Sequence, residues 1–358
     1  MNMKQNALMR TLAAIVASVV LNCVTAAAEP TSHYELVQHV LETHVLPRVE
    51  ILKTNAALLP DAAKRVCESG DDASREELGS AFHSTIESWA AVEFLRFGPM
   101  TDAGLRERMS FWPDPRGIMT RQLRQVMAAK DEKILENGSI AKQSASVQGL
   151  PALEVLLTDK DLPIGPGDAS AYRCKFAIAI ANNVASIAAE FAEGWTKVGG
   201  WKDKMLRPGS DNDTYKEPAE AASELVKALL IGLQVTADNQ VKPRLDANST
   251  FAGPYAKSGL AQEYFKASIA SLQQLYDVMN LESYLPDDKN WVKNWAGGAW
   301  RTMVASDGAG GHVAGVANED APPVRKVFDM ISGLRKLVAG QMSVAAGLTV
   351  GFNELDGD

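Results

Sequence analysis

Apolar side chains recur at helical spacing along most of this chain of 358 residues, and this periodicity limits the possible folds more than any other feature. The clearest stripe, in the segment before Gly199-Gly200, consists of Phe176, Ile180, Val184, Ile187, Phe191 and Trp195. Steps of three and four residues place side chains on one face of an α-helix. No apolar/polar alternation of period two extends over a useful length. The sequence therefore predicts an all-α protein with helices long enough for bundles.

Two capping boxes predict the starts of helices, at Ser32-His33-Tyr34-Glu35 and at Ser74-Arg75-Glu76-Glu77. In a capping box the serine and glutamate side chains bind each other's backbone N–H groups at the first turn. The helix that opens at Ser74 is predicted to continue to Gly98-Pro99. Further helices are predicted at about 218–238, 259–285, 287–306 and from 322 to the C-terminus.

A segment rich in Gly, Pro, Asp and Asn interrupts the helical pattern between residues 197 and 218. Such a composition is typical of a connection between compact units. It predicts an N-terminal helical bundle at residues 29–205 and a C-terminal helical bundle at residues 206–358. Each part is large enough for one bundle.

The first 28 residues have the three parts of a secretory signal peptide: basic residues, a mostly apolar run at 12–24, and Ala26-Ala27-Ala28 at the exit. Cleavage is predicted before Glu29, which makes the mature protein an exported one, most simply in a periplasm. A lipoprotein anchor at Cys23 is disfavoured because the residue before it is not small. No other segment reaches the length of a membrane span.

The charge balance is acidic, with 44 acidic and 36 basic residues and a formal net charge of −8. Loss of the signal removes two of the basic residues and makes the mature chain more acidic. This excess argues against nucleic acid and anionic membrane surfaces as partners.

Of the three cysteines, Cys67 and Cys174 remain after the signal is removed. An even number of cysteines in an oxidising compartment predicts a disulfide between them. The alternative, a catalytic cysteine, has less support because neither residue has a recognisable nucleophile setting.

Two acidic residues stand among apolar ones at helical spacing. Glu154 shares a predicted helix face with Leu150, Leu153 and Leu157, and Glu93 continues the stripe of the Ser74 helix. A buried carboxylate is costly without a partner. Two carboxylates from different helices could bind a hard cation or share a proton. Each could instead pair with an arginine, or Glu154 could lie in solvent on a rotated helix.

Histidines give further metal-ligand candidates. His39 and Glu42, and likewise His83 and Glu87, share a helix face at spacings of three and four residues. Surface pairs of this kind are common, and no third ligand is evident in the sequence. The motifs H-E-x-x-H, G-x-S-x-G and C-x-x-C-H and a Gly-rich phosphate loop are all absent from the sequence.

The segment Phe111-Trp112-Pro113-Asp114-Pro115-Arg116-Gly117 cannot be helical across its two prolines. Asp114 and Arg116 could shape a pocket there, or they could only fix a corner of the chain. The structural role is favoured.

Several motifs in order resemble the imelysin family: HVLPRVE, WAAVEFLRFGPM, FWPDPRG, SVQGLPALEVLL, YRCKFAIAIANNV, KPRL with YAKSGL, and GLTVGFNELDGD. The resemblance covers most of the mature chain. It implies a fold of two four-helix-bundle-like halves that face each other, residence in the periplasm or on the outer surface, and a role in iron uptake. The family was named for a metallopeptidase activity.

The family's marker is G-x-H-x-x-E, whose histidine and glutamate the resemblance implies to be metal ligands. Gly149 and Glu154 match it, but Pro151 stands at the histidine position. A proline side chain cannot bind a metal, although proline suits the first turn of a helix. This departure argues against peptidase activity and against tight binding of a transition metal.

Two functions are therefore expected. The first is a periplasmic binding or accessory protein in iron acquisition, with a ligand cleft between the bundles. Its partners would be a small ligand or metal ion and iron-uptake components of the periplasm or outer membrane; its cofactor is unidentified, with iron or another divalent or trivalent ion as the candidate. The ligand-binding candidates are Glu154, Glu93, Gly149, Asp114 and Arg116, and the metal-ligand candidates are Glu154, Glu93, His39 and Glu42. The second function is an imelysin-type metallopeptidase.

Overall fold

The computed structural model describes residues 31–351 except positions 115, 137, 161–162, 246–252 and 307–323. The predicted signal peptide lies outside these residues. The α-helices are α1 (His33–Val40), α2 (Leu46–Ala56), α3 (Leu59–Glu68), α4 (Asp72–Ala90), α5 (Leu105–Met109), α6 (Ile118–Ala129), α7 (Leu150–Thr158), α8 (Ala171–Thr196), α9 (Trp201–Leu206), α10 (Pro218–Val235), α11 (Ala261–Met279), α12 (Asn290–Val304), α13 (Val324–Leu337) and α14 (Ser343–Ala345). The described residues contain no strand, which confirms the all-α prediction.

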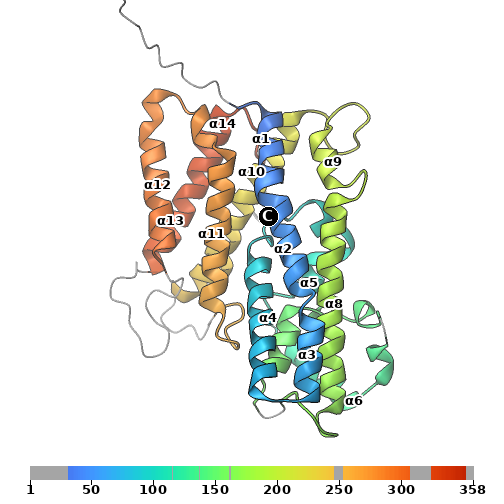
Figure 1. Ribbon diagram of the computed structural model, residues 1–358. Helices are drawn as coiled ribbons and strands as arrows, with labels where there is room; N and C mark the ends of the chain where they lie inside the picture. The colour runs from blue at the N-terminus through green and yellow to red at the C-terminus, as the bar shows by residue number, and fades with distance from the viewer. Residues whose placement is uncertain are drawn as a thin grey trace, which may run out of the picture. The chain divides into compact units, whose positions relative to one another are not determined.

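The long helices contact one another in two groups (Figure 1). Helices α2, α3, α4 and α8 pack together in the first group, and α10, α11, α12 and α13 pack together in the second. Helix α1 joins the second group, because it packs against α10 and α11 although it opens the described chain. The two groups agree with the two bundle-like halves that the sequence predicts. The division of the chain at residues 205 and 206 stays a prediction.

Helices α1 and α2 form one continuous helix, because a π-helical turn at Leu41–Val45 joins them. A π turn contains one extra residue and so rotates the helix face that follows it. The rotation allows α1 to pack on the second group and α2 on the first. Similar π turns follow α10, at Thr236–Val241, and α13, at Val338–Met342.

The two ends of α4 differ from their predicted positions. Asp71 is the N-cap, and its side chain accepts a hydrogen bond from the Ser74 N–H at 2.8 Å. The predicted capping box at Ser74 is therefore wrong, because an equally good cap occurs just upstream; the box at Ser32 is confirmed. The helix ends at Ala90, earlier than predicted. The turn that follows buries residues 92, 94 and 95. In a continued helix these three side chains would not all point to the same side, and one face alone could not bury them all.

A disulfide joins Cys67, near the end of α3, to Cys174, near the start of α8, with the two Cα atoms 5.7 Å apart. The pairing confirms the sequence prediction. It fastens together two helices of the first group.

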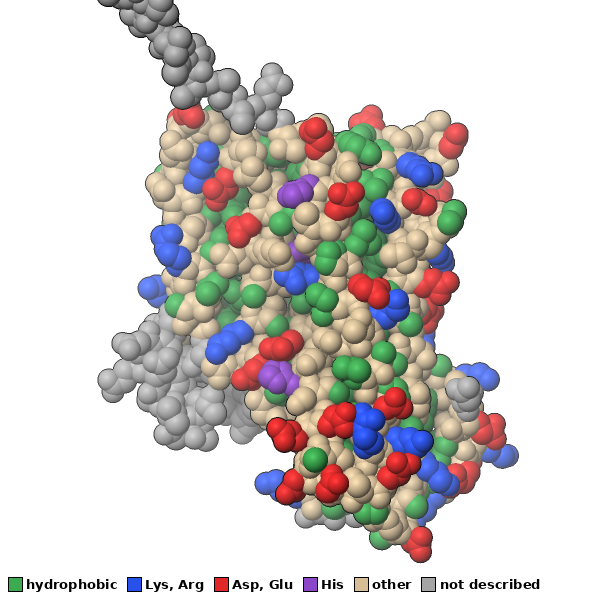
Figure 2. Space-filling model, in the orientation of Figure 1, with side chains coloured by type: hydrophobic (Ala, Val, Ile, Leu, Met, Phe, Trp, Pro, Cys, Tyr) green, Lys and Arg blue, Asp and Glu red, His purple; other side chains and the backbone are tan. Residues whose placement is uncertain are grey.

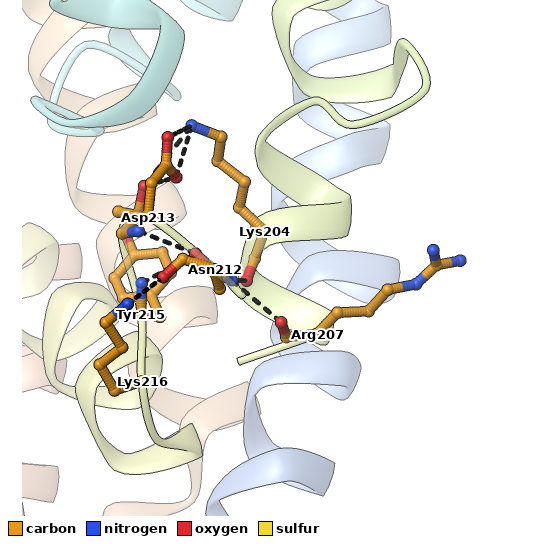
Figure 3. Close-up of polar contacts among 7 residues, drawn as sticks. Lys204, Arg207, Asn212, Asp213, Tyr215 and Lys216 are labelled. Carbon is orange, nitrogen blue, oxygen red and sulfur yellow. Dashed lines mark hydrogen bonds and ion pairs between the residues drawn. The ribbon is translucent and has the colours of Figure 1, made fainter. Parts of the chain in front are cut away.

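The connection from α9 to α10 is ordered around Asn212 (Figure 3). The Asn212 amide donates to the backbone carbonyls of Lys204 and Arg207 at 2.7 and 3.0 Å, and its oxygen accepts from the Tyr215 N–H at 3.0 Å. The ammonium of Lys216 donates to the Asn212 carbonyl at 2.5 Å, and the Tyr215 side chain is buried. Most of this connection is exposed, and these bonds hold it as a fixed loop.

The buried apolar side chains form one continuous cluster that reaches both groups of helices. It includes Trp89 of α4, Trp195 of α8 and Phe265 of α11. The two groups therefore share a core. Of the helices in the described ranges, none combines the length and the apolar character that crossing a bilayer requires.

Candidate ligand site around Glu154

Helix α7 carries Glu154 in its middle and is buried on most of its surface. Gly149 is the N-cap, and Pro151 lies in the first turn, the position that the sequence analysis finds suitable for it. The Glu154 side chain is 5 % exposed. The alternative of a rotated helix with a solvated Glu154 is therefore wrong, because apolar residues occupy almost every side of α7.

Ser258, in the turn before α11, holds the Glu154 carboxylate. Its backbone N–H and its hydroxyl lie 2.9 and 2.8 Å from Glu154 Oε1. The hydroxyl also lies 2.9 Å from the carbonyl of Tyr255. Among the described residues, no arginine forms a salt bridge with Glu154. The site thus joins α7 to the turn that leads into α11.

Burial has a direct effect on the acidity of Glu154. It raises the pKa of the carboxyl group, against the opposing effects of the Ser258 hydrogen bonds and of the Lys257 charge. A carboxyl group with a raised pKa takes up a proton more readily than an exposed one. It can accept hydrogen bonds when ionised and can also donate one when protonated.

Glu93 lies in the turn after α4 and is partly buried. Burial raises its pKa, while a hydrogen bond with Tyr264 and the charge of Arg96 lower it. The ring of Tyr264 packs against that of Tyr255 with 5.0 Å between the centroids. Glu93 is thereby linked to the same turn that contains Ser258.

Glu93 and Glu154, the two carboxylates predicted from the sequence, both lie near the buried Tyr255. Burial raises the pKa of its phenol, and the charges of Glu93 and Glu154 raise it further. The phenol oxygen lies 2.9 Å from Ser110 Oγ. Glu93 and Glu154 therefore surround a common buried tyrosine, each with its own hydrogen-bond partner.

Gly149, a predicted ligand-binding residue, has a packing role in the structure. A Cβ atom there would lie 2.3 Å from the Met109 carbonyl oxygen and 2.4 Å from that of Arg108. Any side chain would force α7 away from α5. The glycine permits the close approach that places Glu154.

We expect Gly149→Ala to lower the free energy of unfolding by about 3 kcal/mol, since the obstructing atoms are backbone and cannot rotate away. Urea unfolding followed by circular dichroism measures the loss. Gly79→Ala is the matched control, because a Cβ at this position in α4 would meet no described atom from outside its own helix turn within 4 Å. The control should be neutral or slightly stabilising. Equal stability of the two variants would contradict the packing role.

Asp114 and Arg116, the other loop candidates, do not pair with each other. The two carboxylate oxygens of Asp114 accept hydrogen bonds from the backbone N–H groups of Ile118 and Met119, each at 2.9 Å. These bonds cap the start of α6. Arg116 is exposed. Asp114 therefore has the structural role that was favoured, through a helix cap.

His39 and Glu42 are exposed, and Glu42 accepts a hydrogen bond from the Gln38 amide at 3.1 Å. His83 and Glu87 form a surface pair at 3.4 Å. Within the part of the chain that the structure describes, no three His, Cys, Asp or Glu residues gather as a metal site. The four predicted metal ligands are not brought together, and these donors do not fit a resident metal ion.

A buried histidine, His44, was not predicted. It lies in the π turn between α1 and α2 and is 1 % exposed. Its Nδ1 accepts from Arg48 Nε at 3.3 Å, and its Nε2 lies 3.5 Å from the Ser271 hydroxyl, which donates to the Ala91 carbonyl. Burial, and then the charge of Arg48, lower the pKa of His44 to about 3. In the sequence, the spacing of four residues between His44 and Arg48 is the one sign that these two side chains share a helix face and could contact each other.

Two cavities flank the C-terminal part of α7. One of about 660 Å³ is lined by residues of α6 and α7 and by Lys257. The other, of about 530 Å³, is lined by residues of α3 and α4 and by Ser258. The turn that holds Glu154 therefore borders both cavities. The sequence analysis used the YAKSGL segment only as part of the resemblance to the imelysin family. It therefore did not predict Lys257 and Ser258 as site residues.

The fold and the site define a class: an all-α protein in which two groups of helices meet at a buried, hydrogen-bonded carboxylate. The family model for imelysin, peptidase M75, matches residues 45–294. The chain belongs to the imelysin family. No curated protein matches it.

Two solved structures are similar to the chain. An imelysin-like protein from Psychrobacter arcticum 273-4 has 20 % sequence identity and a TM-score of 0.72, and the match covers 90 % of this chain and 99 % of that one. A candidate iron-regulated protein A precursor from Parabacteroides distasonis ATCC 8503 has 14 % identity and a TM-score of 0.67, over 90 % and 97 % of the two chains. These likenesses support the fold.

Proposed function

We propose that the protein is an exported binding or accessory protein in iron acquisition that holds a small ligand at the site around Glu154. One observation carries the proposal: Glu154 is buried without a salt bridge to any described residue. Ser258 donates two hydrogen bonds to its carboxylate and the Lys257 backbone N–H donates a third, out of roughly four acceptor positions. A buried carboxylate with unused acceptor capacity suits a ligand that brings a positive charge or hydrogen-bond donors.

The proposed connection with iron rests on the family and on one structural neighbour, the candidate iron-regulated protein A precursor. The proposed location, the periplasm, is supported by the disulfide, since such bonds persist in oxidising compartments. Periplasmic or outer-membrane components of iron uptake would be the protein partners.

An imelysin-type metallopeptidase is the alternative, favoured by the family's description as a peptidase. A zinc peptidase needs three protein ligands around the ion. Pro151 stands where the family's marker has histidine, and the described donors do not gather. These facts support the binding function over the peptidase.

The test is the substitution Glu154→Gln in protein isolated from its own periplasm under iron limitation. Native mass spectrometry and metal analysis measure the bound mass and the iron content. We expect the occupancy to fall at least about tenfold, since the amide keeps the shape but deletes the charge. Glu193→Gln, at an exposed position on α8, is the matched control and should keep the ligand. Equal occupancy in the two variants would remove Glu154 from the site.

The dependence of the free energy of unfolding on pH tests whether the ionised Glu154 carboxylate stabilises the fold by itself. Because its pKa is raised above 4.5, the folded chain keeps this proton to a higher pH than the unfolded chain. The associated stability is fully present below pH 4.5 and is lost as the pH rises through the folded pKa. The Gln variant should therefore lose less stability than the wild type between pH 4.5 and 8. A larger loss would mean that the ionised carboxylate stabilises the fold.

A further inference from the structure

Two adjoining cavities beside α6 are lined with basic side chains. One of about 480 Å³ and one of about 660 Å³ share Met127 and Arg173 in their walls. The basic residues that line the pair are Arg75, Arg124, Lys130, Arg173 and Lys257. We refer to the two as the paired cavity.

The described lining of the paired cavity includes a single acidic residue, Asp159. This is unusual for the molecule, whose formal net charge is −8. On the face shown in Figure 2, acidic and basic side chains are interspersed. Two acidic residues, Asp131 and Glu132, lie near Tyr172 at the cavity wall, and Glu132 is paired with Lys175 at 3.1 Å. The paired cavity is thus a local concentration of positive charge.

Arg173 lies at the centre of this arrangement. Its side chain is 9 % exposed, and it donates to the Leu156 carbonyl at 3.3 Å and to Asp159 at 3.2 Å. Its Nε is buried and has no hydrogen-bond partner among the described residues. A buried donor without an acceptor is costly, so an anion that accepted from it would relieve that cost.

The other four basic residues lack acidic partners in the described part of the chain. Among the described residues, Arg75 donates only to the backbone carbonyls of Gly70 and Ile164, at 3.1 and 3.4 Å. Arg124, Lys130 and Lys257 form no salt bridge with a described residue. The charges of Arg75, Arg124 and Lys130 remain available for a ligand, whereas the charge of Lys257 also acts on Glu154.

We propose that the paired cavity binds a small anion with two or more carboxylate or phosphate groups. Arginine and lysine recognise both groups, arginine through two parallel hydrogen bonds. Two or more anionic groups match cations distributed over two adjoining cavities. The N-terminus of α8, a helix of 26 residues, adjoins the first space and favours negative charge. The paired cavity adjoins the turn that holds Glu154 through Lys257, but its other basic residues lie in or next to α4, α6 and α8, so this site would remain if Glu154 bound nothing.

The test is isothermal titration of the mature protein at low ionic strength with citrate and with pyrophosphate. Arg124→Gln alters an exposed residue of α6, and Lys130→Gln alters the exposed C-cap residue of the same helix, on different cavities of the pair. We expect each to raise the Kd about fivefold. Arg121→Gln is the matched control, because Arg121 is exposed on the same helix and lines neither cavity. It should leave the Kd unchanged.

Binding of citrate alone would assign a carboxylate ligand, and binding of pyrophosphate alone a phosphate ligand; each supports the proposal. If neither binds, or if Arg121→Gln weakens binding as much as Arg124→Gln, the proposal is overturned. Glu154→Gln should bind citrate or pyrophosphate within about threefold of the wild type. Abolished binding in that variant would place the anion at the Glu154 site and overturn a separate one.

Discussion

Replacing Cys67 and Cys174 together with alanine should lower the free energy of unfolding by about 4–5 kcal/mol. The bond spans 107 residues of chain, so its loss frees a large loop in the unfolded state. The native fold should persist in the variant, because α3 and α8 also pack against each other directly. Urea unfolding followed by circular dichroism, with and without reductant, measures the change.

Reductant provides the control for this effect. It should destabilise the wild type to about the same extent as the double substitution and should leave the variant unaffected. A variant within about 1 kcal/mol of the oxidised wild type would contradict the expected contribution of the disulfide.

Acid should destabilise the protein through His44. Its folded pKa of about 3 lies below the unfolded value of 6.5, so the unfolded chain binds the proton first as the pH falls. The stability is fully present above pH 6.5 and is lost progressively toward pH 3. Linkage predicts a loss through this residue of about 2 kcal/mol at pH 5 and about 3 kcal/mol at pH 4.

The measurement compares urea unfolding of the wild type and of His44→Gln between pH 7.5 and 4. Glutamine can offer an amide donor toward Ser271 but does not titrate, so the variant should lose about 2 kcal/mol less stability by pH 5. His39→Gln, at the exposed histidine of α1, is the matched control and should follow the wild type. Parallel pH curves for the wild type and His44→Gln would contradict the assignment.

The fold could be predicted where its determinants are local. The stripe from Phe176 to Trp195 gave α8 its extent and its buried face, since helical spacing is a property of neighbouring residues. Ser32 was identified as a cap for the same reason. The start of α4 was missed because Asp71 and Ser74 are both good caps, and a sequence pattern does not decide between them.

The site could be predicted less completely, because its partners lie far apart in the chain. The apolar neighbours of Glu154 indicated that it is buried, but its partner Ser258 follows 104 residues later. The role of Gly149 depends on the backbone carbonyls of α5, which no local pattern reveals. His44 faces the core because of the π turn, which a periodicity of 3.6 residues does not anticipate.

The placement of α1 has a consequence for the order in which the chain can fold. Its buried residues Leu36, Val37 and Val40 are among the first of the described chain to be synthesised, whereas α10 and α11, on which α1 packs, come much later. The first group of helices can assemble from one contiguous stretch of the chain. The second group is completed only when α1 packs on α10 and α11, which are synthesised well over a hundred residues later. Until then the apolar face of α1 stays uncovered, and an uncovered apolar face makes the nascent protein prone to aggregation.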